Sequence, residues 1–263
     1  MSLPRDTLLE GSRDPEGLQA LIDLATQVLR TWQPAWSGFI DAPLQEEALE
    51  RLGSLSELRW QPYGGHPAAE RCRLLCRRAN DDANDDNEEP VPIQGLRIEG
   101  NFLFDPLRPS DLRQALLRMR AMPWELGDLW VRGDRGGQAL CSPECAALLH
   151  GQRGRVRDVE IVCESVAIDA LQLPSQRAPR QLSSVEASCR LDAIASAGFG
   201  LSRAKVVSQI KAGRLRLNWQ AVKQPSRELH VGDRLQLQDR GQLEVLSMSR
   251  TKRERWRVEM RRT

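Results

Sequence analysis

The chain has 263 residues, of which 40% are hydrophobic and 28% charged, so its length predicts two or three soluble domains rather than one. No stretch approaches the ~18 consecutive apolar residues of a membrane helix, and the first residues lack the basic and apolar regions of a secretory signal. We therefore expect a cytoplasmic protein whose six Cys residues are reduced thiols rather than a disulfide framework.

The net charge of +2 is unevenly distributed along the chain. Residues 177–263 contain 19 Lys or Arg and 8 Asp or Glu, which gives this part a charge of +11 and leaves −9 on the preceding 176 residues. This polarity favours a C-terminal module that binds a polyanion, although a basic solvated surface without a partner would carry the same charge.

The first 70 residues have helical periodicity. Apolar residues recur at helical spacing from Leu18 to Leu29 and Pro34 follows them, which predicts an amphipathic helix over residues 16–30. Residues 43–52 begin with a proline followed by acids, as a helix N-terminus prefers, and predict a second helix. We therefore predict a helical N-terminal region over residues 1–70.

Residues 71–170 alternate between strand and helix patterns. Strands are predicted at 71–78, 93–100 and 156–168, a hairpin at 128–141, and helices at 111–122, with Ser110 as N-cap, and at 143–151. This order predicts an α/β plait of the RRM or ferredoxin-like kind as the middle domain, and it leaves the strand order open.

Two polar segments flank the strands of this middle domain. The acidic run at 80–90 lacks the glycine and the final glutamate of an EF-hand, so we interpret it as a solvated loop rather than a metal site. Residues 171–182 contain two prolines among Ser, Gln and Arg and are predicted to be a linker.

The basic C-terminal part, residues 183–263, is predicted to contain two helices and a small β-sheet, which makes the whole chain an α+β protein. Ser183 and Glu186 have capping-box spacing, so a helix is predicted from there to Gly198. Ser202 is the predicted N-cap of a second helix that Gly213 ends. On this helix Val206, Val207 and Ile210 share one face that can pack, which leaves the rest of its surface free to bind. β-prone runs follow at 215–219, 233–238, 242–249 and 255–261.

A series of residues in the C-terminal part resembles the RNA-binding S4 domain, which is named after a ribosomal protein. The matching positions are Arg190-Leu191-Asp192, Ser202-Arg203, Lys205, Ile210, Gly213, Leu215, Leu217-Asn218, Lys223, Pro225-Ser226, Val231-Gly232-Asp233 and Leu235. In that family the paired helices and the adjoining loop form a basic face that holds structured RNA by its phosphates. Two positions depart from the pattern, because Trp219 stands where the family has a glycine and Ala204 where it has Ser or Thr.

The resemblance implies a set of candidate site residues. RNA-binding roles fall to Arg190, Ser202, Arg203, Lys205, Gln209, Lys211, Arg214, Asn218 and Lys223, and structural roles to Leu191, Asp192, Gly213, Gly232 and Asp233. Helix N-termini and fixed Arg or Lys side chains satisfy phosphate oxygens without reading bases, so we expect recognition of RNA shape and backbone. Asp192, an acid on this face, is expected to orient Arg203 or a neighbouring helix.

Upstream segments resemble YlmH-like proteins. Their similarity to that family rests on Gly64-Gly65-His66-Pro67-Ala68-Ala69-Glu70-Arg71-Cys72-Arg73, on Leu116-Leu117 and on Leu126-Gly127-Asp128-Leu129, whereas Met122-Pro123-Trp124-Glu125 departs from it. The segments LPRDTLLEG and IDLATQVLRTW are similar to its cyanobacterial and plastid branch, often labelled photosystem II S4 domain proteins. The family implies a ribosome-associated RNA-binding protein in translation, rescue or assembly, with relatives acting on large subunits obstructed by peptidyl-tRNA. Whether Arg71 and Arg73 form a second RNA surface with Arg77 and Arg78 is left open.

The chain lacks the usual catalytic motifs, including a Walker A loop, a GxSxG elbow and zinc-deaminase spacing. Cys72/Cys76 and Cys141/Cys145 have a spacing that zinc sites use, but buried small hydrophobes are the simpler interpretation. We therefore predict a non-catalytic protein without metal or cofactor, which binds ribosomal RNA or tRNA on the ribosome or its large subunit. The alternatives are an RNA-modifying enzyme of the pseudouridine-synthase kind with an unrecognised active site, and a protein-binding assembly factor.

Overall fold

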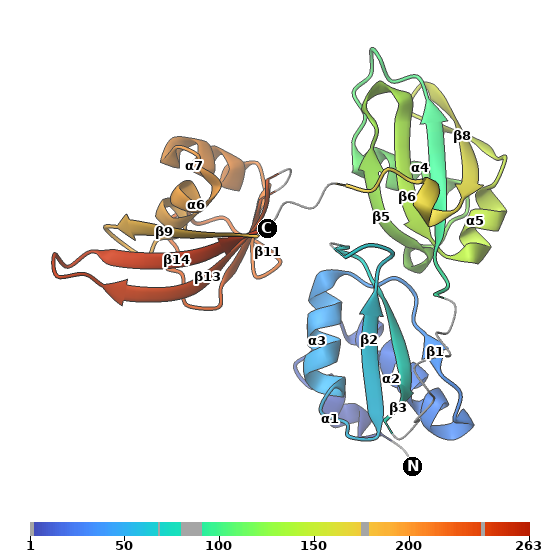
Figure 1. Ribbon diagram of the computed structural model, residues 1–263, viewed down its shortest axis with the longest axis horizontal. Coiled ribbons are helices and arrows are strands. Elements are labelled where there is room, and N and C mark those ends of the chain that lie inside the picture. The colour runs from blue at the N-terminus through green and yellow to red at the C-terminus, as the bar shows by residue number, and fades with distance from the viewer. Residues whose placement is uncertain (1–2, 68, 80–90, 175–178, 238–239) are drawn as a thin grey trace. The chain divides into compact units, whose positions relative to one another are not determined.

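A computed structural model describes residues 3–67, 69–79, 91–174, 179–237 and 240–263. The chain forms two compact units, Met1–Pro174 and Ser175–Thr263 (Figure 1). The acidic run at 80–90 and residues 175–178 of the predicted linker lie outside the described residues. Among the helices that are described, none is long and apolar enough to cross a membrane.

The first unit begins with three helices packed on a small antiparallel sheet. The elements are α1 (Arg5–Leu9), α2 (Pro15–Thr31), β1 (Ala35–Trp36), α3 (Ala42–Leu52), β2 (Leu58–Tyr63) and β3 (Arg73–Arg78), and the strand order is β1-β3-β2. Asp14 and Asp41 cap α2 and α3 by accepting hydrogen bonds from the N–H groups of Gly17 and Leu44. The predicted helices at 16–30 and 43–52 are thus present.

The predicted helical N-terminal region, residues 1–70, also contains the strands β1 and β2, and it shares its sheet with β3, which was predicted as the first strand of the middle domain. Strand β3 is the central strand of the N-terminal sheet, and it pairs with both β1 and β2. Leu74 and Cys76 alternate inward from β3 onto the core that α2 covers. The alternation was readable from the sequence, but its partner β1 is only two residues long and gave no pattern of its own.

The rest of the first unit is the predicted α/β plait. Its elements are β4 (Gln94–Gly100), α4 (Pro109–Arg118), β5 (Leu126–Val131), β6 (Gly136–Cys141), α5 (Pro143–Leu149), β7 (Arg153–Val156) and β8 (Val159–Val166). Three short 3-10 helices lie at Pro123–Glu125, Gly133–Arg135 and Ile168–Ala170. The sheet is antiparallel throughout with the order β5-β6-β4-β8-β7, so β4-α4-β5-β6-α5-β8 has the connectivity of a ferredoxin-like plait, with β7 added at one edge. The N-cap position of α4 is Arg108 and not Ser110, which lies in the first turn, and the Arg108 N–H donates to Asp111 Oδ2 at 3.1 Å.

The second unit packs two helices on one face of a six-stranded antiparallel sheet (Figure 1). Its elements are β9 (Arg180–Glu186), α6 (Leu191–Phe199), α7 (Arg203–Lys211), β10 (Leu215–Leu217), β11 (Gln220–Ala221), β12 (Arg234–Leu237), β13 (Gly241–Arg250) and β14 (Trp256–Arg262). The sheet order is β11-β10-β12-β13-β14-β9. A single core between helices and sheet includes Leu191, Phe199, Val206 and Ile210.

The prediction of a helix from Ser183 to Gly198 was wrong at both ends. Residues 180–186 form the edge strand β9, which pairs with β14 along its whole length and takes up part of the predicted linker. The capping-box pattern also fits a strand with alternating exposure, and the helix begins only after Arg190. It ends at Gly200 (φ 65°), and Gly198 lies inside the helix. A Cβ at position 198 would lie 2.2 Å from the Leu243 side chain, so the close packing of α6 requires a glycine there.

Candidate nucleic-acid interface

The start of α6 carries a fixed guanidinium group. Arg190 is the N-cap residue, and its Nε and Nη2 atoms donate to Asp192 Oδ1 and Oδ2 at 3.0 and 3.3 Å. The Asp192 side chain is 9% exposed and that of Arg190 44%. Asp192 therefore orients Arg190, whereas the sequence led us to expect that it orients Arg203 or a neighbouring helix.

Helix α7 begins as predicted at Ser202, whose hydroxyl accepts a hydrogen bond from the Lys205 N–H at 3.2 Å. Val206 and Ile210 are buried in the core, which confirms the packing face, and Val207 is half-buried beside them. Arg203 is half-exposed and lies 3.6 Å from Glu186 of β9. These contacts leave the Arg203 and Lys205 side chains at the surface, beside the first turn of α7.

The loop after α7 adds further basic side chains. Lys211 is exposed in the last turn, and Gly213 (φ 67°) ends the helix as predicted because its left-handed backbone suits glycine. Lys223 is also exposed, whereas Gln209 and Arg214 are half-buried. The structure thus brings the α7 candidates and the following loop onto one side of the same small core.

Asn218 differs from the other candidates because its side-chain amide is hydrogen-bonded to other residues of the domain. Its Nδ2 donates to Asp233 Oδ1 at 2.7 Å, and its Oδ1 accepts from the Arg234 N–H at 2.9 Å. Asp233 Oδ2 also accepts from the His230 N–H at 2.8 Å, which gives Asp233 the structural role predicted for it. The Asn218 amide fastens the β10–β11 turn to the loop before β12.

The same turn explains the glycine that the S4 pattern has after the asparagine. Asn218 and Trp219 both have positive φ, 47° and 70°, and together they connect strands β10 and β11. Two-residue hairpin turns with positive φ at both positions favour Asn-Gly. Trp219 therefore occupies a backbone conformation that glycine adopts without strain, and the turn keeps its shape despite the substitution.

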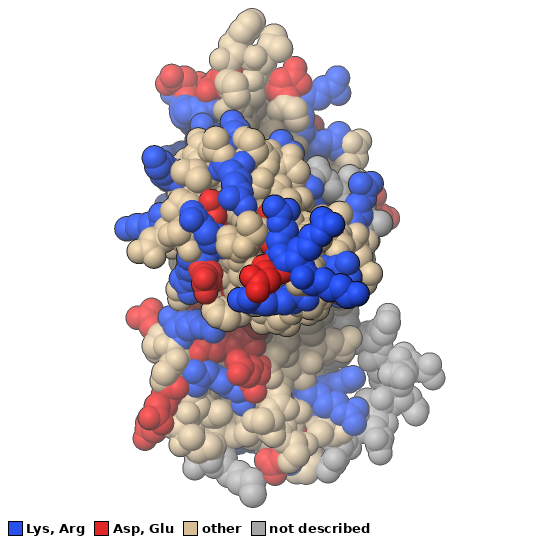
Figure 2. All heavy atoms as spheres, turned by 90° about the vertical axis from the view of Figure 1, so that its left-hand side faces the viewer, with Lys and Arg blue, Asp and Glu red and all other residues tan. Residues whose placement is uncertain are grey.

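The charges of the second unit are visible on its surface. Figure 2 views the molecule from the left-hand side of Figure 1, and Lys and Arg side chains cover much of the centre of this view with few acids among them. Rigid positive charge beside two helix N-termini can bind phosphate oxygens at several points.

The arginines of the upstream segment are engaged inside the first unit. Arg71 donates to the carbonyl oxygens of Leu126 and Phe39 at 3.0 and 3.2 Å. Arg73 donates to those of Ser37 and Pro92 at 2.7 and 2.6 Å. Their guanidinium groups join the N-terminal sheet to the plait, and they do not assemble a four-arginine surface with Arg77 and Arg78.

The plait face opposite its helices is covered by the chain itself. Phe39, Leu140 and Leu171 form a buried cluster there, and Trp130 Nε1 donates to Gln138 Oε1 and to the Gln172 carbonyl at 3.1 and 3.0 Å. RRM domains stack bases on aromatic side chains of this face. The corresponding surface of this chain is occupied by its own residues, so it is a weak candidate for RNA stacking.

The thiols behave as buried apolar groups. All six Cys residues are free and buried, and burial raises the pKa of Cys76 and of Cys163 to about 12. Among the described residues, no three Cys, His, Asp or Glu side chains come together as metal ligands. His66 is buried with Nε2 3.3 Å from Asp128, far in sequence from His150 and His230.

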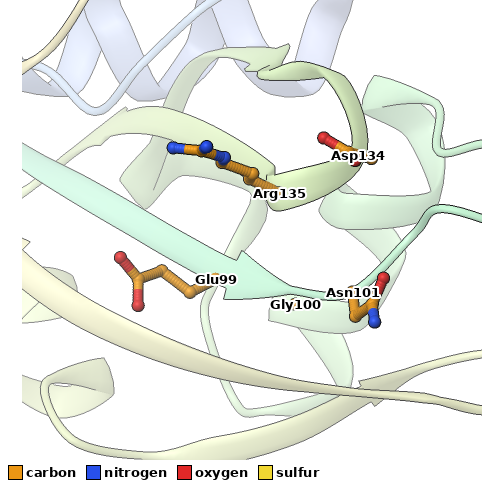
Figure 3. A pocket seen from close by; sticks show the side chains of 5 residues that line it. All are labelled: Glu99, Gly100, Asn101, Asp134 and Arg135. Atoms are coloured by element: carbon orange, nitrogen blue, oxygen red, sulfur yellow. The ribbon is translucent and has the colours of Figure 1, made fainter.

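A hollow of about 330 Å³ lies at the end of β4 in the plait. Glu99, Gly100, Asn101, Asp134 and Arg135 line it. Figure 3 shows the Glu99 and Asp134 carboxylates apart from one another, on different sides of the hollow.

Comparisons with known proteins agree with this placement. Residues 13–80 match the family model "YlmH, N-terminal", and residues 189–235 match the model "S4 domain". The "Ribosome-associated protein quality control protein P2" of Bacillus subtilis (strain 168) is 23% identical over 245 residues, which are 91% of this chain and 93% of that protein. A solved structure, "Cell division protein ylmH from Streptococcus pneumoniae", is similar with a TM-score of 0.46 at 16% identity, over 59% of this chain and 92% of that one.

The matched ranges coincide with structural features. The first range ends just after β3, the central strand of the N-terminal sheet. The second range contains α6, α7 and the strands β10 and β11. Both resemblances inferred from the sequence are thus confirmed, while the cyanobacterial branch stays a prediction.

Proposed function

We propose that this chain, which is YlmH-like and has a C-terminal S4 domain, binds structured RNA of the ribosome through the exposed basic face of α6, α7 and the following loop. The observation that carries the proposal is the placement of Arg190, Arg203 and Lys205. All three lie at the N-terminal turns of helices that are packed on one rigid core, with their charged ends at the surface. Such groups bind phosphates by position and need no unstacked bases.

The proposed partner is ribosomal RNA or tRNA on the ribosome or its large subunit. The name of the Bacillus subtilis relative describes a ribosome-associated protein of quality control, and that relative is similar over nearly the whole of both chains. We further propose that the protein is non-catalytic and acts by binding RNA during translation, rescue or assembly. The alternative is an RNA-modifying enzyme of the pseudouridine-synthase kind.

The test compares two variants that each lose two positive charges. Arg203→Ala/Lys205→Ala removes two proposed phosphate ligands. Arg180→Ala/Arg240→Ala removes two exposed charges beside the ends of β9 and β13 that lie far from Glu186, the residue of β9 beside Arg203. Affinity for ribosomal RNA stripped of protein is measured at several salt concentrations. The first variant should bind more weakly and flatten the slope of log affinity against log salt by roughly 1.5, because fewer counterions are released.

The control variant should keep a slope much closer to that of the unchanged protein. Equal slopes for the unchanged protein and the α7 variant, with both folded by circular dichroism, would refute the proposed site. Altered nucleotides in the ribosomal RNA of a strain that lacks the protein would favour the modifying enzyme instead.

A further inference from the structure

The turn between β13 and β14 is dense in basic residues and lies outside the S4 match. Residues 250–257 contain five arginines or lysines and a single acid, and they follow the matched range, which ends at 235. The basic residues are Arg250, Lys252, Arg253, Arg255 and Arg257, and all five are exposed. The one acid is Glu254.

The turn projects beyond the rest of the sheet. Strand β12 pairs with β13 only up to Glu244, whereas the β13–β14 ladder continues to the pair of Arg250 and Trp256. The neighbouring strand β9 stops at the same level, where Glu186 pairs with Trp256. Residues 251–255 therefore extend past both neighbouring strands, and Figure 1 shows the two strands running out beyond α6 and α7 to this turn.

The backbone of the turn is held without help from its basic side chains. The Thr251 N–H donates to the Arg255 carbonyl at 2.8 Å, and the Glu254 N–H donates to the Thr251 carbonyl at 3.0 Å. The Thr251 hydroxyl also accepts from the Arg255 N–H at 3.2 Å. The charged side chains are thus presented on a hydrogen-bonded scaffold, which lowers the entropy that binding would cost.

The base of the hairpin adjoins the α7 site. Glu186 is the shared neighbour, since it lies opposite Trp256 in the ladder and 3.6 Å from Arg203. The Arg250 guanidinium lies over the Trp256 ring at 5.1 Å from its centroid. Residues paired across a ladder lie on one face.

Arg250 is therefore on the face that the helices cover, because Val258 and Met260 continue from Trp256 into the core. The charge of Arg250 also acts on Cys189, the residue before Arg190. Burial raises the pKa of the Cys189 thiol, and the charge of Arg250 opposes that rise. A line of positive charge thus runs from Arg190 and Arg203 past Arg250 to the turn.

We propose that the β13–β14 turn is a second contact for the phosphate backbone of the RNA that docks on α6 and α7. The inference rests on the proposed function and adds to it, because it assigns binding to Lys252, Arg253 and Arg255, which lie outside the S4 pattern. An extended hairpin with charges at its end reaches a backbone segment that the compact helix face does not.

The experiment uses the full chain and ribosomal RNA stripped of protein. Lys252→Ala/Arg253→Ala changes two exposed side chains of the turn and should leave folding intact. Arg180→Ala/Arg240→Ala is the charge-matched control, because Arg240 directly precedes β13, about 30 Å from the turn at the rise of a β-strand. The turn variant should weaken binding at low salt and flatten the salt slope by roughly 1.5, while the control changes little.

A gain-of-function variant provides an independent test. Glu254→Gln removes the only acid between Arg250 and Arg257, so it should raise the affinity for the same RNA and steepen its salt dependence.

The outcomes separate the inference from the proposed function. Loss of binding in the Arg203/Lys205 variant but not in the Lys252/Arg253 variant would overturn the second contact and leave the first intact. If neither variant has an effect, the proposed function itself fails. If the turn variant binds free RNA normally but no longer binds whole ribosomal subunits, the turn contacts a protein, and the RNA contact is refuted.

Discussion

Asp192 holds the guanidinium group of Arg190 by two hydrogen bonds, 3.0 Å from Nε and 3.3 Å from Nη2, across the first turn of α6. The Asp192 N–H donates in turn to the Pro225 carbonyl at 3.0 Å, and the Leu191 N–H donates to that of Arg227 at 2.8 Å. The start of α6 is thus anchored to the loop before β12. Asp192, which belongs to the S4 pattern, has a structural role here because it fixes the direction of the Arg190 side chain.

The two hydrogen bonds between these residues lead to predictions for one substitution at each of them. Asp192→Ala should lower the free energy of unfolding by about 1–2 kcal/mol, since the carboxylate is buried while its partner is half-exposed, and it should weaken RNA binding by releasing Arg190. Arg190→Ala should also weaken RNA binding, and its cost in stability should be at least as large, because it leaves the buried Asp192 carboxylate without its partner. Urea unfolding and RNA titration of both variants check this, and a loss of stability without any loss of affinity would show that Arg190 is not a phosphate ligand.

Ser202 has two roles that a pair of substitutions can separate. Its hydroxyl caps α7 at 3.2 Å from the Lys205 N–H, so Ser202→Ala should cost about 1 kcal/mol of stability. Ser202→Asp keeps an acceptor at the cap and should keep the stability, but it places a negative charge where a phosphate is proposed to bind. We expect the Asp variant to unfold like the unchanged protein and to bind ribosomal RNA more weakly than the Ala variant does. Equal RNA affinity of the two variants would contradict a phosphate contact at this cap.

The sequence predicted the helices and the plait better than it predicted which strands pair in the other two sheets. Buried helical stripes and caps such as Ser202 are local signals, and they were read correctly. The strands β3 and β9 pair with partners that are distant in sequence, and the residues of a strand do not by themselves predict its partner. Ser183 and Glu186 therefore suggested a helix where the ladder with β14 makes a strand.

The candidate site was predictable as far as it follows a short ordered pattern. The exposed residues of α7 lie where the pattern implied, but the direction of a side chain depends on contacts made after folding. Asn218 is an example, because only the structure shows its amide bound to Asp233. The β13–β14 turn was missed because it lies outside the pattern, although its density of basic residues was a signal in the sequence.

The buried thiols predict how stability depends on pH. Burial raises the pKa of Cys72 to about 11, with the Asp128 charge adding to the rise, and burial raises that of Cys76 to about 12. Because the thiols ionise near pH 8.5 in the unfolded chain, the unfolded state loses protons first as the pH rises. Stability should therefore be full below about pH 8.5 and fall above it, by on the order of 1–2 kcal/mol per thiol at pH 10.

Urea unfolding of the first unit between pH 8 and 10 measures this loss. A Cys76→Ala variant serves as the matched comparison. Its free energy of unfolding should fall less between pH 8 and 10 than that of the unchanged protein, by the amount that one thiol contributes. This difference does not depend on how stable the variant is at pH 8. Alkylation by iodoacetamide at pH 8 provides a second readout, since a protonated buried thiol should react slowly until the chain is unfolded. Rapid alkylation of Cys76 in the folded protein, or a pH dependence unchanged by Cys76→Ala, would show that this thiol is not held in an apolar site by the packing of β3 against α2.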